Sequence, residues 1–127
     1  MMNPETFLKN GSVLVWDQSF AVVRSRRTHP EAFASIIDHN EITVIMDETK
    51  VDEEDVIEIQ KGWKLLTFDM VLPFELVGFL AAVSTAFAEE GIPLFAVSAY
   101  STDHIFVREK DLPKAKEKLR TLGCRVD

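Results

Sequence analysis

The clearest hydrophobic pattern of the chain lies in its second half. Apolar residues recur there at intervals of three and four, which is the spacing of one buried helix face. Alanines fill most of the remaining positions, and Gly91 is typical of the residue that follows a helix. We therefore expect a helix over about residues 74–90, whose core-facing side chains are Leu76, Phe79, Leu80, Val83 and Phe87.

Apolar runs on both sides of this helix predict strands. Residues 63–68 alternate between two faces, and residues 104–108 form another short strand. Residues 92–100 are apolar on both faces, which favours a central strand covered on both sides. Asp111 is expected to cap a second helix that Gly123 ends, before a short strand over residues 124–126. This order is β-α-β-β-α-β, the ferredoxin-like arrangement.

The first half has a weaker pattern. Two strands separated by a turn are expected near its start, at residues 13–16 and 20–24, with the turn at residues 17–19. Phe33, Ile36 and Ile37 predict a short helix beginning at Pro30. Residues 42–46 predict a strand. The polar segment after them is expected to be a loop or one helical turn, and residues 56–59 are too short to classify.

Lys61 and Gly62 mark a break between the two halves. We therefore expect an α+β fold of two ferredoxin-like units in tandem. The first unit, residues 1–61, is degenerate and lacks its second helix, whereas the second unit, residues 62–127, is complete. A unit that is short of a helix must cover its sheet in another way, so the chain is expected to form a homodimer.

Composition narrows the possible classes of protein. The chain has 127 residues and a formal net charge of −7, which argues against nucleic acid or an anionic membrane as a partner. A basic run at residues 24–27 is expected to be a solvated loop. Cys124 is the only cysteine, which is typical of a reducing compartment. No signal peptide or membrane-spanning run is found, so a cytoplasmic location is expected.

Three runs of the second half resemble a known family. Residues 74–81 (FELVGFLA), 91–98 (GIPLFAVS) and 101–107 (STDHIFV) match the turn–helix and strand motifs of ACT domains. They are most similar to the ACT-like subgroup of small bacterial proteins and the cytosolic arginine sensors of animals. The resemblance is specific over residues 63–126 and suggestive over 12–60. Ala99 stands where a Thr is expected, and His104 replaces the more usual aromatic residue.

The resemblance implies a regulatory module and not a catalyst. ACT domains bind amino acids or similar metabolites, usually between two such units, at the turn after the first strand and the neighbouring strand ends. The alternative is an ACT-like interaction module that binds no ligand. An enzyme of unknown activity is a third and weaker hypothesis.

The polar residues of two turns, one leading into the helix within residues 72–80 and one at residues 98–104, fit an amino-acid ligand independently of the resemblance. Gly78, placed in the first helical turn, costs about 1 kcal/mol against Ala, which close approach of a ligand would justify. The free N–H groups of that helix end can bind a carboxylate, and Asp103 can pair with an ammonium. The predicted ligand-binding residues are Phe74, Glu75, Leu76, Val77, Gly78, Ser98, Tyr100, Ser101, Thr102 and Asp103.

The same residues also fit a purely structural role. The Ser-Thr-Asp sequence of residues 101–103 is common in turns that bind no ligand. Gly78 would equally allow close contact between a helix and a sheet. Ser101, Asp103 and His104 are the residue types of a hydrolase triad, but they lie too close together in one turn to act as one. The three histidines lack metal-ligand spacing, and no phosphate-binding glycine motif is present. We predict no catalytic residues, no metal and no cofactor.

Overall fold

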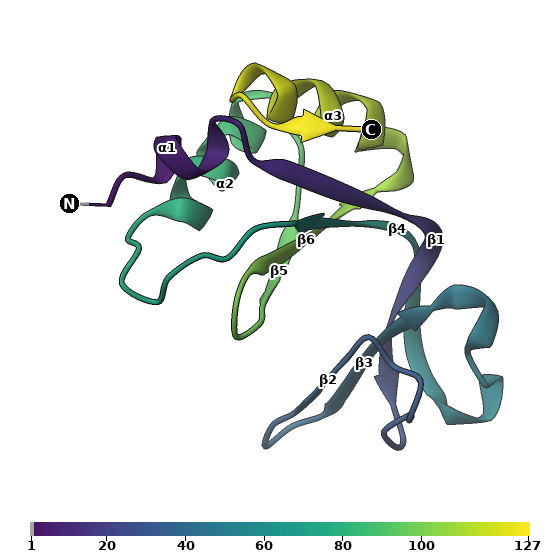
Figure 1. The fold of residues 1–127 in the computed structure, drawn as a ribbon. Coiled ribbons are helices and arrows are strands. Elements are labelled where there is room, and N and C mark those ends of the chain that lie inside the picture. The colour runs from purple at the N-terminus through teal and green to yellow at the C-terminus, as the bar shows by residue number, and fades with distance from the viewer. Residues whose placement is uncertain (1) are drawn as a thin grey trace.

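Two long strands form the centre of the sheet (Figure 1). Strand β1 spans Ser12–Ser25 and strand β4 spans Val56–Phe68. The two pair antiparallel along nearly their whole length, from Val13 opposite Phe68 to Ser25 opposite Val56. The computed structural model describes residues 2–127. Its seven strands follow the order β2-β3-β1-β4-β6-β5, and β7 pairs in parallel with the first residues of β1. The predicted α+β class is therefore confirmed.

The remaining elements are shorter. The other strands are β2 (Ala34–Ile37), β3 (Ile42–Asp47), β5 (Phe95–Ser98), β6 (Asp103–Arg108) and β7 (Arg125–Val126). The helices are α1 (Pro4–Leu8), α2 (Phe79–Glu89) and α3 (Leu112–Thr121), and two 3₁₀ turns, η1 (Glu48–Lys50) and η2 (Glu53–Asp55), follow β3; a third, η3 (Glu109–Asp111), precedes α3. Within residues 2–127, no helix is long and apolar enough to cross a membrane.

The second half has the expected element order, from β4 through α2, β5, β6 and α3 to β7. Its sheet is not built from the second half alone, however. The first residues of β1 lie between β7 and β4, and helix α1 lies beside α2. Strand β1 pairs with β3 of the first unit and with β7 of the second, and β4 runs across the boundary at residues 61 and 62. The division into units 1–61 and 62–127 therefore stays a prediction.

Both turn signals of the first half lie inside continuous strands. Residues 17–19 were expected to reverse the chain, which is wrong: β1 continues through them, with a register shift against β4 between Val15 and Ser19. The Lys64 ammonium donates to the carbonyl oxygens of Asp17 (2.7 Å) and Gln18 (2.9 Å), and so holds the extra residues in place. Extra residues in one strand bend a sheet without ending it.

The break expected at Lys61 and Gly62 is also a strand irregularity. Strand β4 runs through both residues, and a second register shift against β1 lies beside them. Gly62 has a φ of 83°, which glycine adopts without steric cost. Its N–H donates to the Glu48 carboxylate at 3.0 Å. A glycine with positive φ is typical of one class of β-bulge.

The helix expected from Pro30 is wrong. Residues Ala34–Ile37 form β2, which pairs antiparallel with β3. The Asp38 carboxylate accepts hydrogen bonds from the backbone N–H groups of Asn40 (2.8 Å) and Glu41 (3.0 Å), and this closes a hairpin. The apolar residues involved are too few to distinguish a helix from a strand by their spacing.

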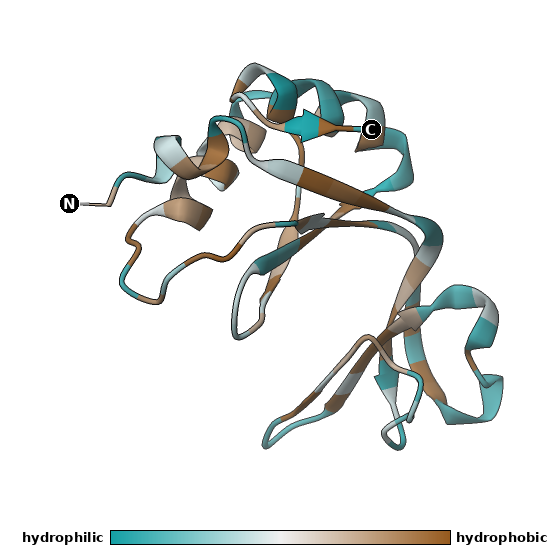
Figure 2. Cartoon of the chain, viewed as in Figure 1, coloured by the Kyte–Doolittle hydropathy of each residue, from teal (hydrophilic) through white to brown (hydrophobic). Residues whose placement is uncertain are grey.

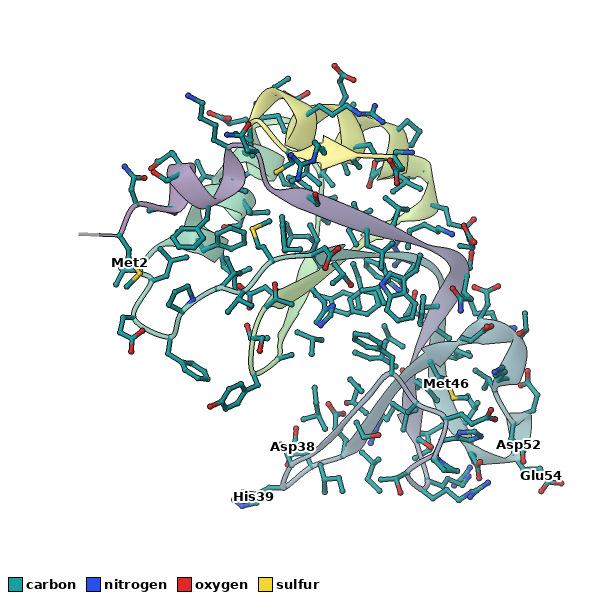
Figure 3. All side chains as sticks on the ribbon, in the orientation of Figure 1. Met2, Asp38, His39, Met46, Asp52 and Glu54 are labelled. Atoms are coloured by element: carbon teal, nitrogen blue, oxygen red, sulfur yellow. The ribbon has the colours of Figure 1, made fainter. Side chains whose placement is uncertain are left out.

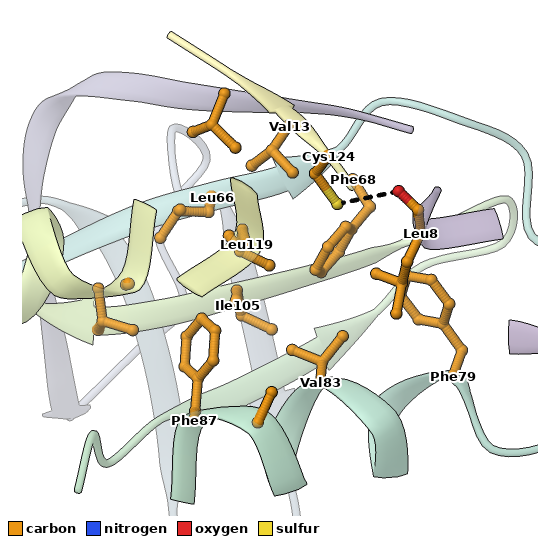
Figure 4. Close-up of a cluster of buried hydrophobic side chains, with 14 of the residues drawn as sticks. Leu8, Val13, Leu66, Phe68, Phe79, Val83, Phe87, Ile105, Leu119 and Cys124 are labelled. Atoms are coloured by element: carbon orange, nitrogen blue, oxygen red, sulfur yellow. Dashed lines mark hydrogen bonds between the residues drawn. The ribbon is translucent and has the colours of Figure 1, made fainter. Parts of the chain in front are cut away.

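All three helices contribute to one main core on one face of the sheet (Figure 4). Val83 and Phe87 of α2 point toward Leu66 and Ile105 of the sheet, and all four side chains are buried. Leu119 of α3 completes the same cluster. The Cys124 thiol donates to the Leu8 carbonyl oxygen at 3.3 Å, and burial raises the pKa of this thiol. The cysteine is therefore a core residue.

Aromatic side chains cover the opposite face of the sheet. Phe33, which precedes β2, lies with its ring 5.6 Å from Trp16, 6.1 Å from Phe20, 5.8 Å from Phe106 and 5.0 Å from His104, measured between ring centroids. All four contacts are edge-to-face, the arrangement that aromatic quadrupoles favour. Phe33 thus ties the β2–β3 hairpin to the face of β6.

Two element boundaries differ from expectation near the second-half turns. Helix α2 begins at Phe79 and not near residue 74, because Gly78 has a φ of 88° and cannot continue a right-handed helix. Strand β5 is an edge strand and not a central one. The apolar residues that suggested burial on both faces include Ile92, which packs in the main core before the strand begins.

Replacing Phe33 should destabilise the whole molecule. Phe33→Ala is expected to lower the free energy of unfolding by about 2–4 kcal/mol, because a half-buried ring with four aromatic neighbours is lost. Phe74→Ala is the matched control, since Phe74 is 72% exposed and should cost little. Urea unfolding of both variants measures the difference. Equal losses of unfolding free energy in the two variants would show that the aromatic contacts of Phe33 do not stabilise the fold.

Candidate functional site

The two turns of the second half lie side by side. The chain leaves β4 at Phe68, and the later turn joins β5 to β6. The Leu72 N–H donates to the Ser101 carbonyl oxygen at 2.7 Å, and the Thr102 hydroxyl donates to the Phe68 carbonyl oxygen at 2.6 Å. These two bonds fix the loop after β4 against the β5–β6 turn.

A cavity of about 180 Å³ lies between the two turns. Most of its lining is apolar, and its polar side chains come from the β5–β6 side: Ser98, Thr102 and Asp103. Because the Thr102 hydroxyl donates to Phe68, it can only accept a hydrogen bond from a ligand. The lining residues are Leu72, Pro73, Phe74, Leu76, Phe79, Ser98, Ala99, Tyr100, Thr102 and Asp103.

The rim of the cavity is aromatic and exposed. Phe74 and Tyr100 are 72% and 82% exposed, and their rings meet edge-to-face with centroids 5.0 Å apart. Val71 and Val77 of the same loop are also exposed. Figure 2 shows hydrophobic residues extending from the end of β4 into this loop. A group of exposed apolar residues around a cavity is typical of a binding surface.

The structure brings together most of the predicted site residues. Glu75 and Val77 point elsewhere, since they line a separate cavity with Asn3 and Glu5 at the start of α1. Ser101 does not line the cavity; its backbone carbonyl oxygen accepts the hydrogen bond from Leu72 that joins the two turns. The sequence reasoning missed Leu72, Pro73, Phe79 and Ala99, of which Ala99 had been noted only for a missing hydroxyl.

Gly78 has a role different from the expected one. It is the N-cap of α2, outside the helix, and its left-handed backbone is unfavourable for other residues. A Cβ built on Gly78 would meet only Pro4 Cγ, at 3.8 Å, which is ordinary contact. Glycine is therefore favoured by the backbone angle, and no close contact with the rest of the described chain requires it. Among the described residues, no side chain caps the first turn of α2.

The electrostatic balance of the cavity is negative. In the part of the chain that the structure describes, Asp103 is the only formally charged residue of the lining, and no basic residue lies there. Within residues 2–127, Asp103 forms no ion pair. A half-buried carboxylate without a cationic partner is suited to an ammonium group supplied by a ligand.

His104 belongs to a hydrogen-bonded chain on the aromatic face. Trp16 Nε1 donates to Thr67 Oγ1 at 2.8 Å, and Thr67 Oγ1 lies 2.7 Å from His104 Nδ1. Because the hydroxyl accepts from Trp16, its own proton is available to a neutral imidazole. Burial lowers the pKa of His104, against the opposing effect of the Asp103 carboxylate. The imidazole is engaged by Thr67 and not by Ser101, so the described residues offer no hydrolase triad at this turn.

The family follows from the second half of the chain. The ACT domain family model matches residues 58–121. The chain belongs to the ACT domain family. This domain is a regulatory module, and the match includes both turns of the cavity. The finer assignment to the subgroup with the arginine sensors stays a prediction. No curated protein sequence matches the chain.

Solved structures share the fold of the whole chain. A protein from Agobacterium tumefaciens is 20% identical, with a TM-score of 0.75 over 93% of this chain and 92% of its own. A possible transport protein from Vibrio cholerae, of unknown function, is 22% identical, with a TM-score of 0.74 over 94% of both chains. The regulatory subunit of aspartate kinase from Thermus thermophilus is 8% identical, with a TM-score of 0.62 over 91% and 98%.

Among residues 2–127, no group of three or more His, Cys, Asp or Glu side chains is placed to hold a metal ion.

The lowered pKa of His104 should make stability depend on pH. Unfolded His104 binds a proton more tightly than folded His104. Its contribution should therefore be complete above the ordinary pKa of 6.5 and should be lost as the pH falls through 6.5 toward the lower folded value. Urea unfolding between pH about 7.5 and about 5.5 measures this slope. His104→Gln should flatten it, and an unchanged slope would exclude His104 as its source.

Proposed function

We propose that the protein is a regulatory protein that binds a small molecule, most simply an amino acid, between the loop after β4 and the β5–β6 turn. The observation that carries this proposal is the cavity of about 180 Å³, with the Asp103 carboxylate on its lining. Its size suits a ligand of a few heavy atoms beyond an α-amino acid backbone. Larger ligands would extend past the aromatic rim.

An α-amino acid has two opposite charges, and the site has a partner for each. The Asp103 carboxylate accepts hydrogen bonds from the ammonium, and Ser98 of β5 lies directly opposite Asp103 in the strand pair. Phe79, the first residue of α2, lines the cavity, and no described side chain caps the N–H groups of this helix end. Uncapped N–H groups at a helix N-terminus stabilise a carboxylate.

The family supports a regulatory function over catalysis. The ACT domain match and the shared fold with a regulatory subunit of aspartate kinase both favour a module that controls another activity. We expect the chain to act in the cytoplasm as a homodimer, without nucleic acid or membrane as a partner.

An interaction module without a ligand is the second candidate. The observation that favours it is the exposure of Phe74, Val77 and Tyr100 around the cavity, since exposed apolar rims also bind proteins. A thermal-shift series over the twenty amino acids separates the two candidates. A ligand at one hundred times its Kd should stabilise the fold by about 2.7 kcal/mol. No shift with any amino acid would favour the interaction module.

Asp103→Asn should weaken amino-acid binding without unfolding the protein. A charged hydrogen bond to an ammonium contributes about 1.5–3 kcal/mol, which corresponds to a loss of roughly ten- to a hundredfold in affinity. Stability should change little, because Asn is as suitable as Asp beside a turn. Isothermal titration with the best amino acid of the thermal series makes the measurement.

Glu75→Gln is the matched control for this measurement. It removes the nearby carboxylate of the same loop, which faces the other cavity, and should leave the affinity unchanged. If both variants bind as the wild type does, Asp103 is not part of the site. If both weaken equally, the effect comes from the general negative charge of the loops.

A further inference from the structure

A second open cavity lies between the start of α1 and the loop that leads into α2. Its volume is about 590 Å³, larger than the cavity of about 180 Å³ beside Asp103. Figure 3 shows Met2 beside this loop, which forms the facing wall. We call it the α1 cavity, and its lining residues are Met2, Asn3, Pro4, Glu5, Glu75 and Val77.

The walls of the α1 cavity expose apolar side chains. Val77 is 79% exposed and Met2 is 40% exposed. Val71 and Phe74 of the same loop are also exposed, so apolar surface continues from the cavity along the loop. Sites for small molecules usually enclose most of the ligand surface, which walls as open as these cannot do. Exposed apolar side chains around such an open hollow are typical of contact with another protein.

The charged residues of the α1 cavity are all acidic. Glu5 comes from α1 and Glu75 from the loop, and both are exposed. Within residues 2–127, neither carboxylate forms an ion pair, and no Lys, Arg or His lines the cavity. The Asn3 side chain is already engaged, because its Oδ1 accepts a hydrogen bond from the Glu5 backbone N–H at 2.9 Å. The polar complement of this surface is therefore a cation.

We propose that the α1 cavity docks a segment of another protein that combines apolar side chains with Lys or Arg. The apolar side chains pack against Met2 and Val77, and the cationic side chain lies near the carboxylates of Glu5 and Glu75. A guanidinium is the better match for two carboxylates, because its planar set of donors can bind both. That the docked segment belongs to the protein regulated by this module rests on the proposed function.

One loop separates the α1 cavity from the cavity beside Asp103. Phe74 and Leu76 line the cavity beside Asp103, whereas Glu75 and Val77 line the α1 cavity. Alternate residues of the loop thus belong to opposite walls. A segment bound to Glu75 and Val77 is then in contact with the loop that also contacts a ligand, which is a suitable place for the partner of a regulatory module.

Selection of short random peptides on the full chain tests the charge of the docking surface. The selected peptides should combine apolar residues with Lys or Arg, and fluorescence anisotropy measures their affinity. Glu5→Lys together with Glu75→Lys should weaken their binding by about tenfold or more, because two attractive pairs become repulsive. Glu53→Lys with Glu54→Lys is the matched control, since it changes the net charge equally at η2, away from Met2 (Figure 3), and should bind as the wild type does.

A second pair of variants tests the apolar wall. Val77→Ser should weaken the binding of the same peptides by about tenfold, because a buried apolar contact is lost. Val71→Ser is the matched control, since Val71 is 70% exposed on the same loop but does not line the α1 cavity. All the substituted residues are exposed, so thermal unfolding should show that each variant folds as the wild type does.

The peptide assay contains no amino acid, and the ligand site is tested separately by Asp103→Asn. A failure of the docking surface is therefore distinguishable from a failure of the proposed function. Selection that yields no basic peptides, equal losses of affinity in the Glu53→Lys, Glu54→Lys control, or binding unchanged by Val77→Ser would each overturn the proposal.

Discussion

The two shared strands constrain everything else in this molecule. Strands β1 and β4 are each paired near both of their ends, so neither half of the chain can complete its sheet without the other. The bend between the halves is set where β1 carries extra residues opposite β4. There the Lys64 ammonium satisfies two backbone carbonyls that the ladder leaves free. A cation bound to two carbonyl oxygens is a strong local restraint.

The candidate site follows from where these strands end. Strand β4 leaves the sheet at Phe68 beside the first residues of β6, and the β5–β6 turn therefore comes within hydrogen-bonding distance of the loop after β4. The loop then has to return over the sheet to begin α2, and Gly78 makes that change of direction with a backbone angle that other residues rarely adopt. The cavity is the space left between two loops that the sheet topology forces together.

The sequence was informative where contacts are local. The buried face of α2, the strand at β6 and the helix before β7 could all be predicted from spacing and end signals. The bulges could not, because Asp17 and Gly62 are turn-forming residues and only the opposite strand decides whether the chain reverses or bends. The predicted start of α2 was wrong for a related reason: the apolar spacing continues upstream to Leu76, but the left-handed backbone of Gly78 keeps the helix from starting before Phe79.

The site was predictable to a similar extent. Topology alone brings the two turns together, so Asp103, Ser98 and Tyr100 all line the cavity, and their binding of a ligand stays a prediction. Glu75 and Val77 were predicted as ligand-binding residues within the run that resembles the ACT turn–helix motif, but they line the separate cavity beside α1. Pro73 and Leu72 gave no polar signal, although they form part of the wall.

The aromatic face of the sheet is largely covered from within the same chain. A sheet with helices on one face usually needs a partner for the other face, but here Phe33 and the β2–β3 hairpin already cover much of it from within the same chain. Hydrogen bonds link Trp16 of β1 to Thr67 and Thr67 to His104, whose ring then contacts Phe33 edge-to-face. The free backbone edge of β5 and the exposed rings of Phe74 and Tyr100 beside it are not covered in this way by the rest of the described chain.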